Sequence, residues 1–217
     1  MKPSAACASS NSRPDLHTPL QPNPHYPMNP IRTCLAFIPA LLAVCTADTL
    51  PEHAREQIGV TVTYDPAYVS LPYPGGDVAQ DRGVCTDVVI RAMRRKGLDL
   101  QKAVHEDMKA NFSRYPRQWG LKRPDKNIDH RRVPNLTTFM SRRGWSLPVT
   151  KNPADYLPGD IITCTVPPNL PHIAIVSDRK NAEGTPLIIH NIGSGTQEED
   201  MLFTFPLTGH YRPSWSK

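Results

Sequence analysis

"DRGVCTDVVIRAMRRKG", residues 81–97, holds a cysteine at the point where a glycine-containing loop turns into an amphipathic helix. Apolar residues recur at helical spacing after the loop, and Gly97 is typical of a helix end. Cys85 then lies in the first helical turn, where free backbone N–H groups and the helix dipole favour a thiolate over a thiol. A small buried apolar residue or half of a disulfide would also suit this position. The basic residues predicted to project to solvent are Arg91, Arg94, Arg95 and Lys96.

The region before this helix divides into a tail, a leader and the start of a domain. Residues 1–27 are rich in proline and lack apolar periodicity, which is typical of a disordered segment. Residues 28–47 carry Arg32 before an apolar run of about a dozen residues, which predicts a secretory signal peptide with a true start at Met28. Cleavage is expected after Cys45 or Ala47, and cleavage after Ala47 leaves a single domain, residues 48–217. We favour soluble export to the periplasm or cell envelope over a lipid anchor on Cys45, with no stable membrane insertion.

Composition and cysteine usage narrow the function classes. The net charge of +5 falls to +3 once residues 1–47 are removed, because the tail and the leader together carry three basic residues and one acidic residue. This excess suits an anionic envelope polymer as well as a basic solvated face. The sequence has no nucleic-acid-binding motif, so we expect no nucleic-acid partner, and we expect a monomer. It has no Cys-x-x-Cys pair, so we expect no structural zinc, no other metal and no cofactor.

The mature chain changes in character at about residue 155. Helical patterns come first, and Val/Ile/Thr-rich segments typical of strands follow. This order predicts an α+β domain with an antiparallel meander and with the helices on one face of the sheet. Asn135 is expected to cap the helix that follows it and Gly144 to close that helix. The predicted helices are 48–59, 85–96, 98–112 and 133–145, the predicted strands are 60–65, 156–166, 171–178, 185–193 and 201–212, and residues 113–132 are predicted to be an irregular basic excursion.

Two histidines lie at the ends of neighbouring predicted strands. His172 opens "HIAIV" and His190 ends "LIIH", so both are expected to face the start of the Cys85 helix. A cysteine-protease-like site needs a thiol, an imidazole and a polar group that orients the imidazole. Cys164 shares a strand face with Ile162 and is expected in the core, or it is the disulfide partner of Cys85.

The order of these motifs resembles a known group of enzymes. "PGD" before a strand, then "HIAIVSD", then a strand ending in His, all after a Cys at a helix start, is similar to the NlpC family of papain-like peptidoglycan endopeptidases and the related CHAP amidases. Tyr73, with Gly75 and Gly76, precedes Cys85 as a tyrosine does in the NlpC group. More narrowly, "DRGVCTDVVIRA", "PGDII" and "HNIG" resemble one bacterial domain family of that superfamily, over about residues 50–212. The usual Asp-Cys-Ser is replaced here by Val84-Cys85-Thr86.

The resemblance implies a papain-like fold and hydrolysis of an amide bond in peptidoglycan stem peptides. Cys85 is the implied nucleophile and His172 the implied base. His190 is preferred over Asn191 as the residue that orients His172. Further roles are expected for surrounding residues: Tyr73 for the oxyanion, Asp87 and Asp160 for substrate amines, and Arg114, Arg117, Lys122 and Arg123 for substrate carboxylates.

Purely structural interpretations of some of these residues remain open. Asp87 would equally stabilise the helix dipole, and the four basic residues would equally form a solvated loop. Two other functions also remain: an envelope-binding module with a Cys85–Cys164 disulfide, and a papain-fold acyltransferase.

Overall fold

The computed structural model describes residues 48–215, so the predicted tail, signal peptide and Cys45 lie outside the described residues. Helix α2, Cys85–Arg95, buries Val88, Ala92 and Met93 almost completely, and Gly97 follows it with a φ of +85°. The burial of these residues and the glycine after the helix end confirm the predicted helix. Glycine suits this position because it adopts the left-handed conformation without steric cost. No helix within residues 48–215 is long and apolar enough to cross a membrane.

One basic residue of α2 differs from its prediction. Arg91 is buried, not projected to solvent, and its guanidinium forms a two-pronged contact with the carboxylate of Asp77, with the closest atoms 2.9 Å apart. Arg91 also donates to Thr61 Oγ1 and to three backbone carbonyl groups. A buried guanidinium is tolerated when its donors are satisfied in this way, and the helical pattern alone cannot show these distant partners.

The remaining helices confirm the predicted order, with shorter bounds. Asn135 does not cap α4: the N-cap is Arg132, and Asn135 lies inside the first turn, where its Nδ2 donates to the carbonyl of Asp129 at 3.1 Å. Gly144 follows the helix end with a φ of +73°, as predicted. The helices are α1 (Leu50–Arg55), α3 (Leu100–Asn111) and α4 (Val133–Arg142), with single 3-10 turns at Phe112–Arg114, Asp129–Arg131 and Pro153–Asp155.

A six-stranded antiparallel sheet forms the second half of the domain. The strand order is β3-β8-β4-β5-β6-β7, so the last strand returns to pair with β4 and the predicted simple meander is wrong at that point. Two short strands, β3 and β7, were not predicted from the sequence. The strands are β3 (Ser146–Leu147), β4 (Ile161–Val166), β5 (Leu170–Lys180), β6 (Pro186–His190), β7 (Gln197–Glu199) and β8 (Leu207–Tyr211). A separate parallel pair, β1 (Thr63–Tyr64) and β2 (Arg82–Gly83), precedes α2.

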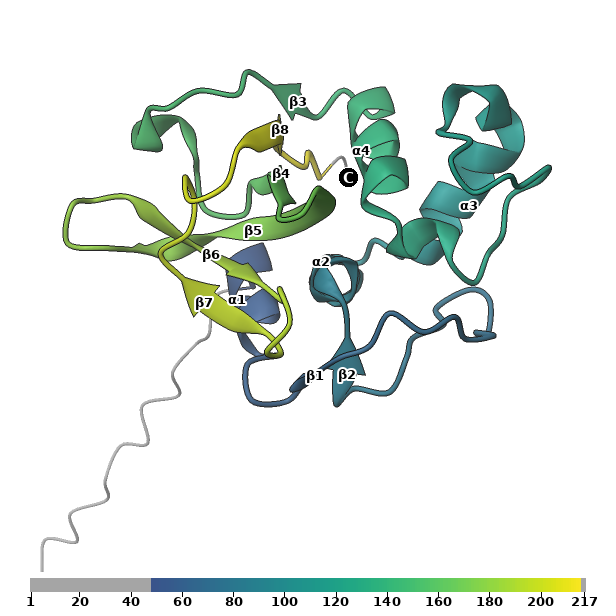
Figure 1. The fold of residues 1–217 in the computed structure, drawn as a ribbon, viewed down its shortest axis with the longest axis horizontal. Helices are drawn as coiled ribbons and strands as arrows, with labels where there is room; N and C mark the ends of the chain where they lie inside the picture. Colours follow the sequence, from purple (N-terminus) through teal and green to yellow (C-terminus); the bar gives the residue numbers. More distant parts are fainter. Residues whose placement is uncertain (1–47, 216–217) are drawn as a thin grey trace, which may run out of the picture. The chain divides into compact units, whose positions relative to one another are not determined.

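The sheet separates two apolar clusters. On one face, Ile173, Ile175 and Ile189 pack with residues of α1, α2 and α4, which confirms the predicted α+β arrangement with helices on one face. On the other face, Ala174 and Ile188 pack with residues of the loops before β4 and after β7. Alternate residues of β5 and β6 therefore face opposite sides, as in any regular strand. Figure 1 shows α2 lying near the ends of β5 and β6, where the predicted site residues lie.

Candidate functional site

Cys85 is the first residue of α2. Val84 is the N-cap in extended conformation, and its N–H donates to Oδ2 of Asp87 at 2.7 Å. The carboxylate of Asp87 thus makes one of the two hydrogen bonds of a capping box. The other is missing, because the side chain of Val84 has no polar atom that could accept it. The helix start is therefore fixed by backbone and Asp87 contacts, and these hold Cys85 in place.

The sulfur of Cys85 is buried and meets β5 at its backbone. The backbone N–H groups of Ile173 and Thr86 act to lower the pKa of the thiol, because they stabilise the thiolate. Burial outweighs these donors and, together with the charge of Asp87, raises the pKa of Cys85 to about 12. The resting residue is a neutral thiol, which corrects the expectation that the helix start produces a thiolate. Helix-dipole effects are small beside the cost of burying a charge.

His172 and His190 form a buried pair. Nε2 of His172 lies 2.9 Å from Nδ1 of His190, and the two rings meet edge to face. Burial and the repulsion from His190 lower the pKa of His172 to about 3, so the ring is neutral at physiological pH. Burial also lowers the pKa of His190, while the carboxylate of Glu199, 3.0 Å from its Nε2, raises it. The structure therefore brings together the two predicted histidines and adds Glu199.

The sulfur and the imidazoles reach β5 from different sides. Cys85 packs in the cluster that contains Ile173, whereas alternation places His172 and His190 on the face of Ala174 and Ile188. The structure shows no hydrogen bond between Cys85 and either imidazole within the part of the chain that it describes. The expectation that both histidines face the start of α2 is thus corrected: the sulfur lies against the residue next to His172 and is not paired with its ring.

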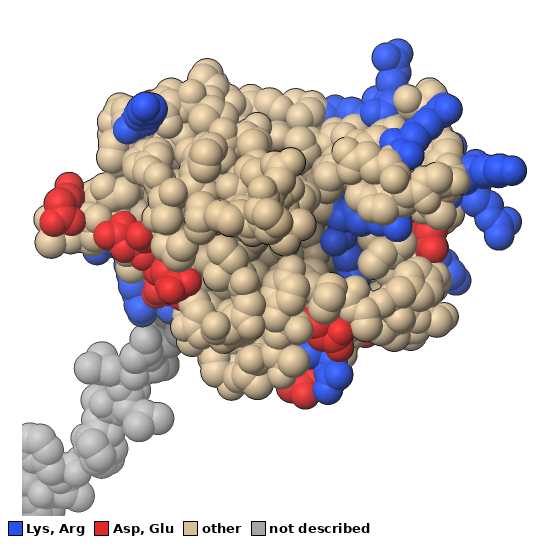
Figure 2. Space-filling model, viewed as in Figure 1, with Lys and Arg blue, Asp and Glu red and all other residues tan. Residues whose placement is uncertain are grey.

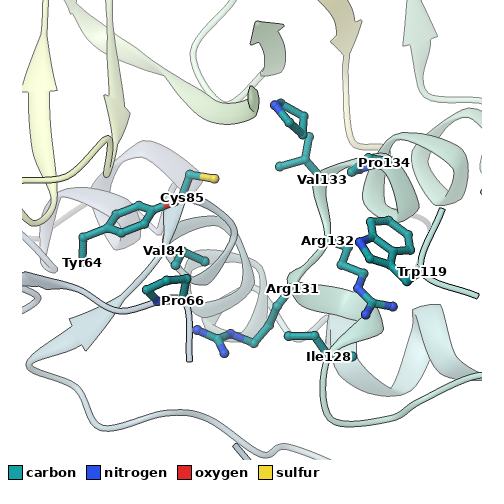
Figure 3. Close-up of a pocket in the computed structure, with 11 residues that line it drawn as sticks. Tyr64, Pro66, Val84, Cys85, Trp119, Ile128, Arg131, Arg132, Val133 and Pro134 are labelled. Atoms are coloured by element: carbon teal, nitrogen blue, oxygen red, sulfur yellow. The ribbon is translucent and has the colours of Figure 1, made fainter. Parts of the chain in front are cut away.

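A cavity of about 210 Å³ opens beside Cys85. Figure 3 shows the sulfur pointing toward the space between Tyr64 on one side and Val133 on the other. Burial and the neighbouring Cys85 and Asp87 raise the pKa of Tyr64 to about 12, so its hydroxyl keeps its proton and can donate. The cavity is lined by Tyr64, Pro66, Val84, Cys85, Trp119, Ile128, Arg131, Arg132, Val133, Pro134 and Pro171.

Asp87 holds the site together and is not available to substrate. Its two oxygens accept from Nε and Nη2 of Arg131, each at 2.9 Å, and both side chains are almost fully buried. This corrects the predicted contact with substrate amines, because the carboxylate has no free, accessible oxygen to offer. Asp160 is likewise buried, and its oxygens accept from Arg212 at 2.7 Å and from His210 at 2.8 Å. Its predicted contact with substrate is corrected for the same reason.

Two other predicted residues lie elsewhere. Asn191 is buried, and its Nδ2 donates to the carbonyl of Gly83 at 3.1 Å, so it ties the end of β6 to the chain entering α2 and does not orient His172. Tyr73 packs edge to face on His105 of α3 and does not line the cavity beside Cys85. Tyr64 occupies the place expected for it, which corrects the assignment of Tyr73.

The predicted basic excursion borders the cavity on one side. Arg114, Arg117, Lys122 and Arg123 are all exposed, as a solvated loop would be. Arg132, in the cavity wall, lies with its guanidinium carbon 4.0 Å from the centre of the Trp119 ring. Figure 2 shows Lys and Arg gathered on the side of the molecule that carries α3 and α4. Arg132 also pairs with the carboxylate of Asp129 at 3.0 Å, and the four exposed basic residues do not line the cavity, so the unpaired positive charge lies on the outer surface of this loop.

Sequence reasoning missed Tyr64, Arg131 and Glu199. Tyr64 lies in a strand of only two residues, and Arg131 lies in the irregular excursion, so neither has a periodic pattern around it. Glu199 belongs to a three-residue acidic strand that reads as a turn. Their spacing from Cys85 and His190 along the chain gave no signal, since only the folded sheet brings them there.

Both cysteines of the described chain are free thiols. Cys164 is buried on β4 opposite His172, with the same alternation as Ile162, as predicted for a core residue. Within residues 48–215 no three His, Cys, Asp or Glu side chains are arranged to hold a metal ion.

Comparisons with known sequences cover nearly all of the described residues. The family described as "Domain of unknown function (DUF1287)" matches residues 51–213. The chain is also 60% identical over 163 residues to a protein of Escherichia coli (strain K12) with the name "Uncharacterized protein YijF". That alignment covers 75% of this chain and 80% of the relative. The range matched by the family contains Cys85, His172, His190 and Glu199.

Proposed function

We propose that this chain, which belongs to the DUF1287 family, is a cysteine hydrolase of papain-like fold that cleaves an amide bond in peptidoglycan stem peptides. The observation that carries the proposal is the placement of Cys85. Its thiol lies at a helix start, in the wall of a cavity, and the backbone N–H groups of Ile173 and Thr86 stabilise its thiolate. A structural cysteine needs none of these features, whereas a nucleophile needs an opening to substrate and donors that stabilise its negative charge.

The proton of the thiol passes to His172 in this proposal. Nδ1 of His172 has no hydrogen bond among the described residues, while Nε2 is engaged with His190. As sulfur attacks the substrate carbonyl carbon, Nδ1 accepts the thiol proton and later donates it to the leaving amine. Water, deprotonated by the same nitrogen, then hydrolyses the thioester and releases the acid. Because thiol and imidazole are both neutral at rest, the site works by general-base catalysis and not through a standing ion pair.

In this proposal, substrate binding brings the imidazole of His172 to the sulfur of Cys85. Ile173, which contacts the sulfur, is the residue after His172 near the start of β5, so a local change at that strand end joins the two groups. Catalytic hydrogen bonds are often long before substrate binds and shorten in the complex. This change has to bring the His172 ring from the Ala174 face of β5 to the face that packs on α2, because the ring and the sulfur lie on opposite faces of the strand.

Two donors are available for the developing oxyanion. The N–H of Cys85 is among the first of its helix and has no acceptor within it. The Tyr64 hydroxyl, protonated and beside the cavity, supplies the second donor. Loss of one such donor typically slows acyl transfer about 100-fold or more.

The substrate class rests on the motif order shared with the NlpC group and on charge. The exposed basic residues of the loop at 113–132 favour a peptide with free carboxylates, as stem peptides have, whereas Arg132 in the cavity wall is already paired with Asp129. The predicted export of the chain would place it where such a polymer lies.

Purified peptidoglycan tests the proposal. The wild-type protein is expected to release soluble muropeptides, and mass spectrometry identifies the cleaved bond. Cys85→Ala is expected to release none. Cys164→Ala is the matched control, because it removes the other buried thiol of the described chain and leaves the cavity unchanged. If the wild type and both variants release nothing, or if all three release fragments equally, the proposal is wrong.

A further inference from the structure

Glu199 faces the buried imidazole pair from solvent. Its partner on β6 is Ile188, so alternation places its side chain on the same face as His190. Oε2 of Glu199 lies 3.0 Å from Nε2 of His190, which forms no well-aligned hydrogen bond among the described residues. The contact is therefore chiefly electrostatic. About two-fifths of the Glu199 side chain is exposed, whereas His190 is buried. Glu199 therefore lies between the buried histidine pair and the solvent.

The charge of Glu199 is not shared with a basic side chain. Within residues 48–215 no Lys or Arg lies within ion-pair distance of its carboxylate. The preceding residue, Glu198, behaves differently, because it is paired with Arg55 and Arg179. The attraction of Glu199 is thus directed at His190 alone.

A carboxylate at this position determines where the protons of both histidines lie. It favours a proton on Nε2 of His190, which leaves the lone pair of Nδ1 to accept a hydrogen bond. The donor to Nδ1 is Nε2–H of His172, 2.9 Å away. A neutral imidazole carries one such proton, so Nδ1 of His172 is left unprotonated.

We propose that Glu199 is a positioning residue that sets the tautomers of His190 and His172, so that Nδ1 of His172 is the free base. The tautomer assignment stands on the contacts alone. Its consequence for catalysis rests on the function proposed above.

Nitrogen NMR of the imidazoles tests the tautomers without any need for activity. In the wild type, Nδ1 of His172 and Nε2 of His190 are expected to have the shifts of an unprotonated and a protonated nitrogen, respectively. In Glu199→Ala both rings are expected to show mixed tautomers, and the pKa of His190 is expected to fall by about one unit, the lower end of the effect of an opposite charge nearby. Glu199→Gln, which keeps an acceptor but loses the charge, is expected to show the pKa change with a smaller tautomer change.

Glu183→Gln is the matched control, since Glu183 is exposed in the β5–β6 hairpin. It is expected to leave both histidines unchanged. Wild-type tautomers and an unchanged His190 pKa in Glu199→Ala would overturn the proposal. So would the opposite tautomers in the wild type.

Hydrolysis of peptidoglycan gives the catalytic consequence. Glu199→Ala is expected to lower kcat about tenfold with little change in KM, because a tautomer bias worth one pKa unit corresponds to about a tenfold change in the ratio of the two tautomers of His172. An inactive wild type would reject the proposed function while the NMR result still decides the tautomers. An active wild type with an equally active Glu199→Ala variant would reject the positioning role while leaving the proposed function intact.

Discussion

Arg131→Met is expected to destabilise the domain by about 3–5 kcal/mol, the usual cost of removing one partner from a buried ion pair. The cost follows from what remains: Asp87 keeps a buried charge with only the N–H of Val84 to accept from. Arg131 also donates to the carbonyl groups of Asp65 and Ala67, so these lose their partner as well. A typical domain has only about 5–15 kcal/mol of stability, so the variant is expected to be only marginally folded.

Urea unfolding followed by circular dichroism gives the free energy of unfolding of each variant. The double variant Asp87→Asn/Arg131→Met is expected to be more stable than Arg131→Met, because it removes the unpaired charge while asparagine still accepts from Val84. Lys102→Met is the control: Lys102 pairs with Glu106 at the exposed surface, 4.0 Å apart, and its loss is expected to cost less than about 0.5 kcal/mol.

A loss below about 1 kcal/mol in Arg131→Met would refute the reasoning, since that is the range of an exposed ion pair. A double variant no more stable than the single one would show that packing, and not the buried charge, determines the cost.

Three further predictions concern stability. The folded pKa values of His172 and His130, about 3 and about 4, lie below the unfolded value near 6.5. The free energy of unfolding is therefore expected to be fully retained above pH 6.5 and to fall below it, by up to about 1.4 kcal/mol per histidine per pH unit. Urea titrations of His130→Gln should show a shallower fall with pH. Asn191→Ala removes the donor to Gly83 and is expected to cost about 1–3 kcal/mol by urea unfolding, whereas an unchanged midpoint would contradict the bridging role. Gly195→Ala is expected to lower the melting temperature more than Gly184→Ala, because both have positive φ but only the Cβ at 195 lies 2.5 Å from a backbone oxygen, so equal losses would contradict the close approach.

Local sequence patterns predicted the main helices and strands. The order of the strands in the sheet depends on long-range pairing, which those patterns do not contain. The apolar spacing of α2 and the glycine after it are local signals, so the position of Cys85 at a helix start was predictable. The closeness of the two histidines followed from their places at the ends of neighbouring strands, whereas the prediction that both face the start of α2 was wrong. The return of β8 to β4 was not predictable, because only packing of the two sheet faces selects the neighbour of the last strand.

The errors at the site share one cause. Arg91 and Asp87 have the sequence appearance of solvent-facing or ligand-binding charges, yet each is buried against a partner 14 and 44 residues away. Tyr73 matched a motif spacing, while Tyr64 reaches Cys85 through the short β1–β2 pair. The electrostatic environment of the thiol likewise depends on burial by β5, which raises its pKa against the effect of the helix start.

Mass spectrometry of the acid-quenched protein after incubation with stem-peptide substrates tests most directly whether Cys85 carries the chemistry. The account predicts a thioester at Cys85, with the mass of the acyl part of the cleaved peptide, in the wild type and in Cys164→Ala. It predicts neither adduct nor cleavage in Cys85→Ala. Cleavage that persists in Cys85→Ala, or an adduct found on Cys164, would contradict it.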